Sequence, residues 1–312
     1  MSEVLVVGSV ALDWVKTPAG EGKDVLGGAA VYFSLAARLF ARVRMLAVVG
    51  SDFPREHRSM LETKGIDLEG LETARGKTFR WRGAYAKDMN SAKTLQTDLN
   101  VFSSFRPKLS PAHKSAPIVF LANMDPELQW EVLSQVENPA LVACDTMNYW
   151  IDSKRPALKE LLSRVDILFL NDEEAKSLSG EPNNVKAAMR LREWGPSAVV
   201  IKKGEHGSML MAGERVYAFP AYPLAEIKDP TGAGDSFAGG FMGWLASRGA
   251  GAPGVQALKR AMLYGSVLAS YNVQEFSTKS LEALDLPAVQ RRYKDYLDLL
   301  SIEDGVLDGR AV

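Results

Sequence analysis

The chain has 312 residues, 46% of them hydrophobic, and is therefore long enough to bury a large core within one α/β domain. Its 37 lysines and arginines nearly balance 38 aspartates and glutamates, which excludes the basic surface of a nucleic-acid-binding protein, so we expect no nucleic-acid partner. A single cysteine and three scattered histidines exclude a disulfide framework and a zinc site.

The chain begins with an apolar run that has no basic leader and is too short to span a bilayer. We therefore expect a cytoplasmic protein with no membrane partner. Similar apolar runs recur along the chain and predict strands over residues 4–10, 44–50, 118–123, 141–145, 166–171 and 198–204. Because these runs are apolar on both faces, they are typical of a parallel sheet that is covered by helices on each side.

Longer segments separate these strands and predict helices over residues 29–41, 54–64, 126–137, 154–163, 183–194, 234–248, 254–271 and 287–300. The last helix is the clearest, because its apolar residues keep helical spacing and Pro287 stands near its first turn. The repeated order of strand, helix and strand predicts one α/β domain over residues 1–312. Its sheet should be open, mostly parallel and flanked by helices.

One region departs from this order. In residues 78–86 the aromatic residues Phe79, Trp81 and Tyr85 alternate with Arg80, Arg82 and Ala84. In residues 93–102 the apolar residues Leu95, Leu99 and Val101 all stand at odd-numbered positions, which is the two-residue period of a strand. We interpret residues 78–102 as a small β lid, to which residues 13–26 could contribute. An ordinary edge hairpin is the alternative, but an aromatic face needs a cover, which favours a lid or a homodimer formed through it.

Polar residues or glycines follow the predicted strands at six places: Gly8-Ser9 with Asp13 beyond, Gly50 to Asp52, Asn123, Asp145, Asn171 and Gly204. The carboxyl ends of parallel strands line the ligand crevice of an open α/β sheet. This pattern indicates a binding site at that edge, although loops are polar in general.

The stretch DPTGAGDSFAGGF (residues 229–241) leads directly into an apolar helix. The first amides of a helix have no partner within it, and burying them dry costs about 1–3 kcal/mol each. Gly232 and Gly234 leave room for an anion to approach these amides at the positive end of the helix dipole. Asp235 would repel such an anion, so we interpret it as a base that accepts a proton from a hydroxyl group. The alternative is an acid that only complements the dipole.

These segments resemble the ribokinase-like (PfkB) carbohydrate kinase family. Residues 229–241 match its C-terminal signature over their full length, and GGAAVYFSLAARLF (27–40) with VRMLAVVGSDF (43–53) resembles its N-terminal signature less tightly. NDEEAKSLSG (171–180) is similar to its Asn-x-x-Glu element, and VVIKKGEHG (199–207) to its nucleotide-side strand and turn. The resemblance covers nearly the whole chain. It implies a ribokinase-like fold and ATP-dependent phosphorylation of an alcohol, usually on a sugar or nucleoside.

The resemblance also implies roles for residues around the predicted helix start. Asp235 would be the catalytic base, and the amides of Gly232, Ala233 and Gly234 would form the anion hole. The cofactors would be ATP and Mg²⁺. In some members, residues that match Asp229 and Thr231 help to hold a monovalent cation, which makes K⁺ a further candidate.

On the nucleotide side, the resemblance implies that Asn171 and Glu174 organise Mg²⁺, largely through water. Lys202 and Gly204 would lie beside the nucleotide together with Gly232 and Gly234. Asparagine followed by glutamate three residues later is also a capping-box pattern, and both roles could coexist in Asn171 and Glu174.

On the acceptor side, Asp13, Gly27 and Gly28 would meet the substrate, with Asp13 accepting hydrogen bonds from its hydroxyls. Ribokinases carry an asparagine where this chain has Tyr32, so a bulkier or less polar contact is expected there.

The acceptor hypotheses start with a sugar or polyol. A nucleoside is the alternative, since Phe79, Trp81, Tyr85 or Tyr32 could stack on a base, and a phosphosugar bound by Arg80 and Arg82 is a third. A non-catalytic sugar or nucleotide sensor is an alternative of another class, but a sensor needs no base beside a phosphate.

Overall fold

The structure is a computed structural model, and it describes residues 2–90 and 92–301. Its main sheet has nine strands in the order β13-β12-β11-β10-β9-β8-β1-β4-β5. Seven neighbouring strands from β11 to β5 run parallel, and β12 and β13 extend the sheet as an antiparallel hairpin. The strands are β1 (Glu3–Val7), β4 (Arg42–Gly50), β5 (Ile66–Ala74), β8 (Ile118–Leu121), β9 (Leu141–Asp145), β10 (Ile167–Asn171), β11 (Ala198–Lys202), β12 (Ser208–Ala212) and β13 (Arg215–Phe219).

Helices cover both faces of this sheet because its strands are apolar on both faces. In β1, Val4 and Val6 enter one hydrophobic core, whereas Leu5 and Val7 enter the other. The first core includes α1 (Ala29–Ala37), α2 (Arg55–Thr63), α9 (Ala233–Ser247), α10 (Val255–Asn272), α11 (Lys279–Ala283) and α12 (Leu286–Leu300). The second includes α4 (Pro126–Gln135), α5 (Asn148–Ser153), α6 (Arg155–Leu162), α7 (Asp172–Ser179) and α8 (Asn184–Arg192), and the short α3 (Pro111–Lys114) lies beside it.

The expected ribokinase-like α/β fold is confirmed, and each predicted strand and helix is present with small differences at its ends. Three strands of the main sheet were not predicted. The exposed acids of β5 interrupt its apolar pattern, and β12 and β13 form a hairpin outside the strand-helix alternation.

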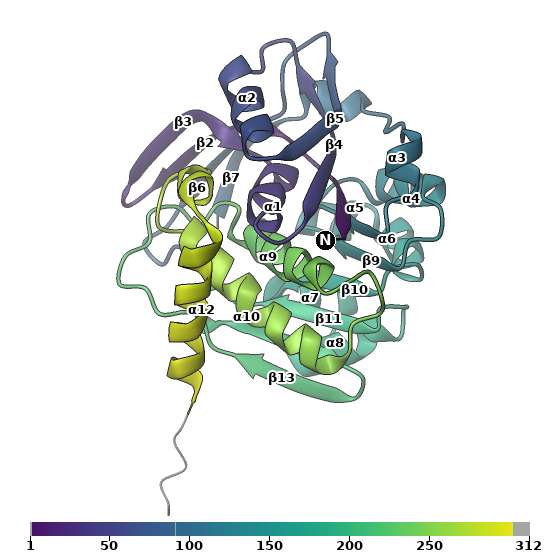
Figure 1. The fold of residues 1–312 in the computed structure, drawn as a ribbon, viewed down its shortest axis with the longest axis vertical. Helices are drawn as coiled ribbons and strands as arrows, with labels where there is room; N and C mark the ends of the chain where they lie inside the picture. Colours follow the sequence, from purple (N-terminus) through teal and green to yellow (C-terminus); the bar gives the residue numbers. More distant parts are fainter. Residues whose placement is uncertain (1, 91, 302–312) are drawn as a thin grey trace, which may run out of the picture.

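A second sheet of four strands has the order β3-β2-β6-β7 (Figure 1). It contains β2 (Ala11–Thr17), β3 (Gly20–Gly27), β6 (Arg80–Tyr85) and β7 (Ala92–Asp98). The prediction of a strand up to residue 102 was wrong, because β7 ends at Asp98 and the 3₁₀ helix η1 (Asn100–Ser104) follows. Val101 is buried in the main body, whereas Leu95 stays exposed, so their shared parity does not define one sheet face.

Glycines let α9 pack closely between two neighbouring helices. A Cβ on Gly239 would lie 2.4 Å from the Phe33 carbonyl oxygen of α1, and a Cβ on Gly240 would lie 2.8 Å from the Tyr264 carbonyl oxygen of α10. Both distances are too short for a real side chain, so these glycines set the position of α9. None of the helices in the described ranges is long and apolar enough to cross a membrane.

Candidate active site

The N-terminus of α9 lies near the carboxyl end of β11 in the main sheet. Gly232 precedes the helix with φ of 74° and provides no side-chain cap, and residues 231–235 are half-buried, whereas residues 236–243 are buried. The Ala233 N–H donates to the Pro230 carbonyl oxygen at 3.1 Å. Within residues 2–90 and 92–301, the Gly232 and Gly234 amides have no acceptor. These two amides are therefore available to an anion.

Asp235 lies in the first turn of α9, beside these amides. Loss of hydration raises the pKa of its carboxyl to about 7, with a further increase from Asp145 and an opposing decrease from Lys202. No ion pair joins Asp235 to another described residue. A carboxylate with a pKa near neutrality and no fixed cation partner is suited to general-base catalysis.

Lys202, at the end of β11, extends over the start of α9. Its Nζ lies 2.8 Å from Asp145 Oδ2, and a Cβ on Gly234 would lie 2.9 Å from the same Nζ. The β10–β11 register places Lys202 directly beside Asn171. Thus the structure places the predicted nucleotide-side residue Lys202 close to both Gly234 and the Asp145 carboxylate.

Asn171 and Glu174 close the start of α7 as a capping box. The Asn171 N–H donates to Glu174 Oε2 at 2.7 Å, and the Glu174 N–H donates to Asn171 Oδ1 at 2.8 Å. Burial, followed by the negative charge of Asp145, raises the pKa of Glu174 to about 8. The capping interpretation is confirmed. It uses one oxygen of the Glu174 carboxylate, so the expected contact with hydrated Mg²⁺ is compatible with the cap.

Asp229 fixes the loop before α9. One of its carboxylate oxygens accepts the Thr231 N–H at 2.9 Å, and the other accepts the Ser277 N–H at 3.0 Å. The Thr231 hydroxyl donates to the Tyr85 hydroxyl at 3.2 Å, which links this loop to β6 of the small sheet. The two candidate cation ligands therefore also have structural roles.

The predicted acceptor residues meet where the small sheet joins the main body. A Cβ on Gly27 would lie 1.9 Å from Asp13 Oδ2, and a Cβ on Gly28, at φ of 99°, would lie 2.4 Å from the Ser9 carbonyl oxygen. Only glycine fits at position 28, whereas a side chain at position 27 would displace the Asp13 carboxyl. Asp13 Oδ1 is buried and has no hydrogen-bond donor among the described residues. This buried oxygen is therefore available to accept a hydrogen bond.

Asp13 is also close enough to residues 229–235, the candidate catalytic loop, to interact with them electrostatically. Burial, followed by the charge of Asp229, raises the pKa of Asp13 to about 8, and Asp235 contributes in the same direction. Tyr32 lies in α1 and is buried. Its ring packs so closely on Gly232 that a Cβ on this glycine would lie 2.3 Å from the ring. The structure therefore brings Asp13 and Tyr32, which the resemblance assigned to the acceptor side, close to the start of α9.

The turn after β11 contacts the tip of the β6–β7 hairpin. Gly204 has φ of 53°, and its missing Cβ would lie 3.0 Å from Asn90 Oδ1. The Asn90 side-chain amide donates to Glu205 Oε1 at 3.0 Å. Sequence reasoning did not identify Asn90 or Ser277 because each contact joins segments far apart in the chain.

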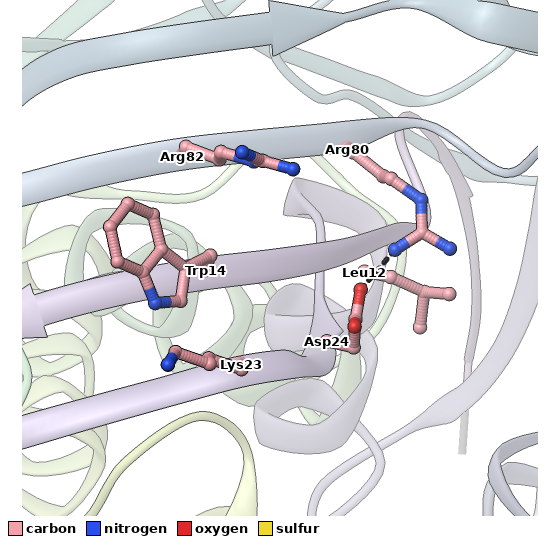
Figure 2. Close-up of a pocket in the computed structure, with 6 residues that line it drawn as sticks. All are labelled: Leu12, Trp14, Lys23, Asp24, Arg80 and Arg82. Carbon is pink, nitrogen blue, oxygen red and sulfur yellow. Dashed lines mark hydrogen bonds and ion pairs between the residues drawn. The ribbon is translucent and has the colours of Figure 1, made fainter.

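A hollow of about 240 Å³ lies on the small sheet. Figure 2 shows the side chains that line it, which are Leu12, Trp14, Lys23, Asp24, Arg80 and Arg82. Trp14 and Arg82 are neighbours across β2 and β6, and the guanidinium lies 6.0 Å from the centre of the indole ring. Arg80 pairs with Asp24 and with Asp52. Since Leu12 and Trp14 flank Asp13 on the strand, Arg80 and Arg82 point away from the catalytic loop and do not support a phosphosugar site.

The fold and this site define a phosphotransferase of the ribokinase-like class, which transfers a phosphoryl group to a hydroxyl acceptor. The model of the pfkB family of carbohydrate kinases matches residues 1–283. The chain belongs to this family.

Several relatives of this chain are named as nucleoside kinases or as a cytidine kinase. The chain is 31% identical to the cytidine kinase of Thermococcus kodakarensis over 247 residues, which cover 78% of this chain and 88% of that protein. It is 28% identical to a nucleoside kinase of Methanothermobacter thermautotrophicus over 295 residues, covering 89% of this chain and 91% of that protein.

Solved structures share the fold. The nucleoside kinase of Methanocaldococcus jannaschii has a TM-score of 0.76 at 21% identity, covering 95% of this chain and 99% of that chain. A putative ribokinase II from E. coli, solved with ATP and Mg²⁺, has a TM-score of 0.78 at 18% identity, covering 95% and 100% of the two chains.

Proposed function

We propose that this protein is an ATP-dependent nucleoside kinase in which Asp235 is the general base and the Gly232 and Gly234 amides form the anion hole. The observation that supports the reaction most directly is the uncapped start of α9, where free amides lie beside a carboxyl whose pKa is about 7. Ala233, whose N–H is bonded within the turn, contributes mainly by shaping this loop.

In the proposed reaction, the acceptor hydroxyl gives its proton to the Asp235 carboxylate while its oxygen bonds to the γ-phosphorus of ATP. The bond from that phosphorus to the oxygen bridging the β- and γ-phosphates breaks, and ADP leaves with the electron pair. The Gly232 and Gly234 amides stabilise negative charge on the transferred group, since their dipoles are already oriented. General-base catalysis of this kind contributes about 10²–10⁴-fold to the rate.

The nucleotide site is proposed between the α9 start and the turn at Gly204, with Lys202 beside the phosphates. Asn171 and Glu174 would hold Mg²⁺ through water, and the ion would neutralise phosphate charge when bound. Asp229 and Thr231 remain the candidate ligands for K⁺, since a carboxylate oxygen that accepts one amide retains a second lone pair. Turnover that is equal in K⁺ and in Na⁺ would remove this cation from the proposal.

The nucleoside acceptor is supported by the named relatives and by the aromatic groups around the catalytic loop. Tyr32 packs on Gly232, and Tyr85 accepts a hydrogen bond from Thr231. Trp81 and Phe79 are engaged elsewhere: Trp81 Nε1 donates to Thr94 in β7, and Phe79 packs on Phe102. Because Tyr32 is buried against Gly232, base stacking is assigned to Tyr85, which is only partly buried.

A free sugar or polyol is the second candidate acceptor. The observation in its favour is Asp13, whose free oxygen could accept a hydrogen bond from any hydroxyl, including those of a ribose ring. The same oxygen serves both substrate classes, so the base-contacting groups must distinguish them.

A phosphorylation screen over nucleosides, sugars and polyols with ATP and Mg²⁺ tests the proposal, with Asp235→Asn as the inactive control. We expect the highest kcat/KM with a nucleoside. Faster phosphorylation of a free sugar would replace the acceptor but keep the kinase. Tight binding of ATP and acceptor without turnover would instead indicate a sensor.

A further inference from the structure

Two sources of positive charge meet at the start of α9. The first is the helix N-terminus, which carries about half a positive charge on its free amides. The second is the ammonium of Lys202, whose Nζ would lie 2.9 Å from a Cβ on Gly234. The Lys202 side chain is only 15% exposed, so water screens this repulsion weakly.

Asp145 keeps the ammonium in this unfavourable position. Its Oδ2 lies 2.8 Å from Lys202 Nζ, and its Oδ1 accepts the Thr146 N–H at 2.8 Å, so both carboxylate oxygens are fixed. The Asp145 side chain is 5% exposed. Burial lowers the pKa of Lys202, but the negative charges of Asp145, Glu174 and Asp235 together raise it above its ordinary value. The lysine is therefore held as a cation at the tip of α9.

A structural ion pair would not need to be placed against a helix N-terminus, because that location weakens the pair. The arrangement becomes favourable when an anion lies between the ammonium and the helix amides. Phosphoryl transfer supplies such an anion, since negative charge is spread over the oxygens of the transferred group. A lysine can contact one of these oxygens as a point charge.

We infer that Lys202 is a catalytic residue that contacts the transferred phosphoryl group from the side opposite the Gly232 and Gly234 amides, and that Asp145 is a positioning residue that holds its ammonium there. This inference rests on the proposed kinase function. The Lys202 ammonium remains with the enzyme throughout and forms no covalent bond.

The test combines kinetics with nucleotide binding in four variants: Lys202→Met, Lys202→Arg, Asp145→Asn and Lys203→Met. Removal of one donor to a developing anion lowers kcat by about 10²–10³-fold, and we expect this loss in Lys202→Met with little change in the acceptor KM. Lys202→Arg should recover part of the rate because it keeps the charge. Lys203→Met is the matched control, since the neighbouring lysine forms no ion pair within the described ranges, and it should keep nearly full turnover.

Asp145→Asn should lower kcat by about tenfold or more, because the ammonium remains but is less well placed. Its defect should be smaller in combination with Lys202→Met than alone, since a positioning residue has no effect once its target is absent.

Calorimetry with ATP and ADP, in an Asp235→Asn background that slows turnover, provides a readout besides activity. Lys202→Met should weaken ATP binding more than ADP binding, because only ATP carries the phosphoryl group that Lys202 contacts. Equal losses for both nucleotides, or nearly normal kcat in Lys202→Met, would overturn the inference. If Lys202→Met does not fold, Lys202→Arg and Asp145→Asn give the answer: unchanged kcat in both would also overturn it.

These outcomes separate this inference from the proposed function. If the unmodified protein phosphorylates no acceptor, the proposed function fails, while the difference between ATP and ADP binding still decides whether Lys202 contacts the terminal phosphate.

Discussion

Two helices, α7 and α9, begin at the same edge of the main sheet but are completed differently. At α7 the amides of Asn171 and Glu174 are satisfied by each other's side chains in a reciprocal capping box. At α9 the corresponding position is Gly232, which has no side chain to cap the helix. Both helices carry an acid in the first turn, but Asp172 of α7 pairs with Lys176, whereas Asp235 has no ion-pair partner among the described residues.

The comparison shows how a helix start becomes a reactive site. At α7 side chains of the protein satisfy two amides at the helix start, so this cap needs no ligand. At α9 the amides of Gly232 and Gly234 and the Asp235 carboxyl are left for substrates to satisfy. Such a helix start contributes less to the folding free energy than a capped one, because preorganised catalytic groups commonly cost stability.

Substitution of Asp235, compared with substitution of Asp172 in α7, should give the largest difference between the two helices. Asp235→Asn should lower kcat by about 10²–10⁴-fold with little change in ATP affinity, because the amide cannot accept the proton. Asp172→Asn, at the capped helix, should leave kcat nearly unchanged. Steady-state kinetics with the best acceptor measures both, and near-normal turnover in Asp235→Asn would show that another group is the base.

The pH dependence of activity tests the role of Asp235 at the start of α9. Asp235 must be deprotonated to act, and since its pKa is about 7, kcat/KM should fall about tenfold per pH unit well below pH 7. Its folded-state pKa lies above the ordinary value of 3.8, so its contribution to stability is full at low pH and is lost as pH rises through 7. Unfolding of this site therefore does not explain lost activity at pH 5. A flat kcat/KM profile between pH 5 and 8 would contradict the base assignment.

The glycines beside the two helices sharpen the comparison further. Gly232 and Gly180 have nearly the same φ, 74° and 77°, but a Cβ on Gly232 would collide with Tyr32, whereas a Cβ on Gly180 meets nothing within 4 Å. Gly232→Ala should lower the unfolding free energy by about 2–4 kcal/mol and reduce turnover. Gly180→Ala should lower it by about 1 kcal/mol and keep activity. Denaturant unfolding measures both, and equal losses would mean that Tyr32 moves aside.

The smallest expected effect comes from removal of the α7 cap. Asn171→Ala should lower the unfolding free energy by about 1 kcal/mol. Asn183→Ala is a matched variant, since the Asn183 side chain accepts two amides at the start of α8, away from the site. Similar stability losses with a higher KM for Mg-ATP only in Asn171→Ala would support its second role. Identical kinetics in both variants would limit Asn171 to capping.

The sequence predicted much of the fold because buried parallel strands and their covering helices carry distinct periodicities. The resemblance to the PfkB family, rather than any strand or helix pattern, grouped Asp13, Tyr32, Lys202 and Asp235 as candidate site residues. The sequence did not predict that Lys202 pairs with Asp145, because both residues end strands and only the sheet order makes those strands near neighbours. The hairpin contact of Asn90 with Glu205 joins positions 115 residues apart, and no local pattern encodes it.

The close packing of α9 has a consequence for how variation is tolerated. Gly239 and Gly243 are not among the candidate site residues. However, a Cβ on Gly243 would lie 2.8 Å from the Ala37 Cα in α1. A methyl group at either position would push the whole helix outward and carry its tip with it. Selection for activity should therefore purge changes on the buried flank of this helix as strictly as changes at its chemically active end.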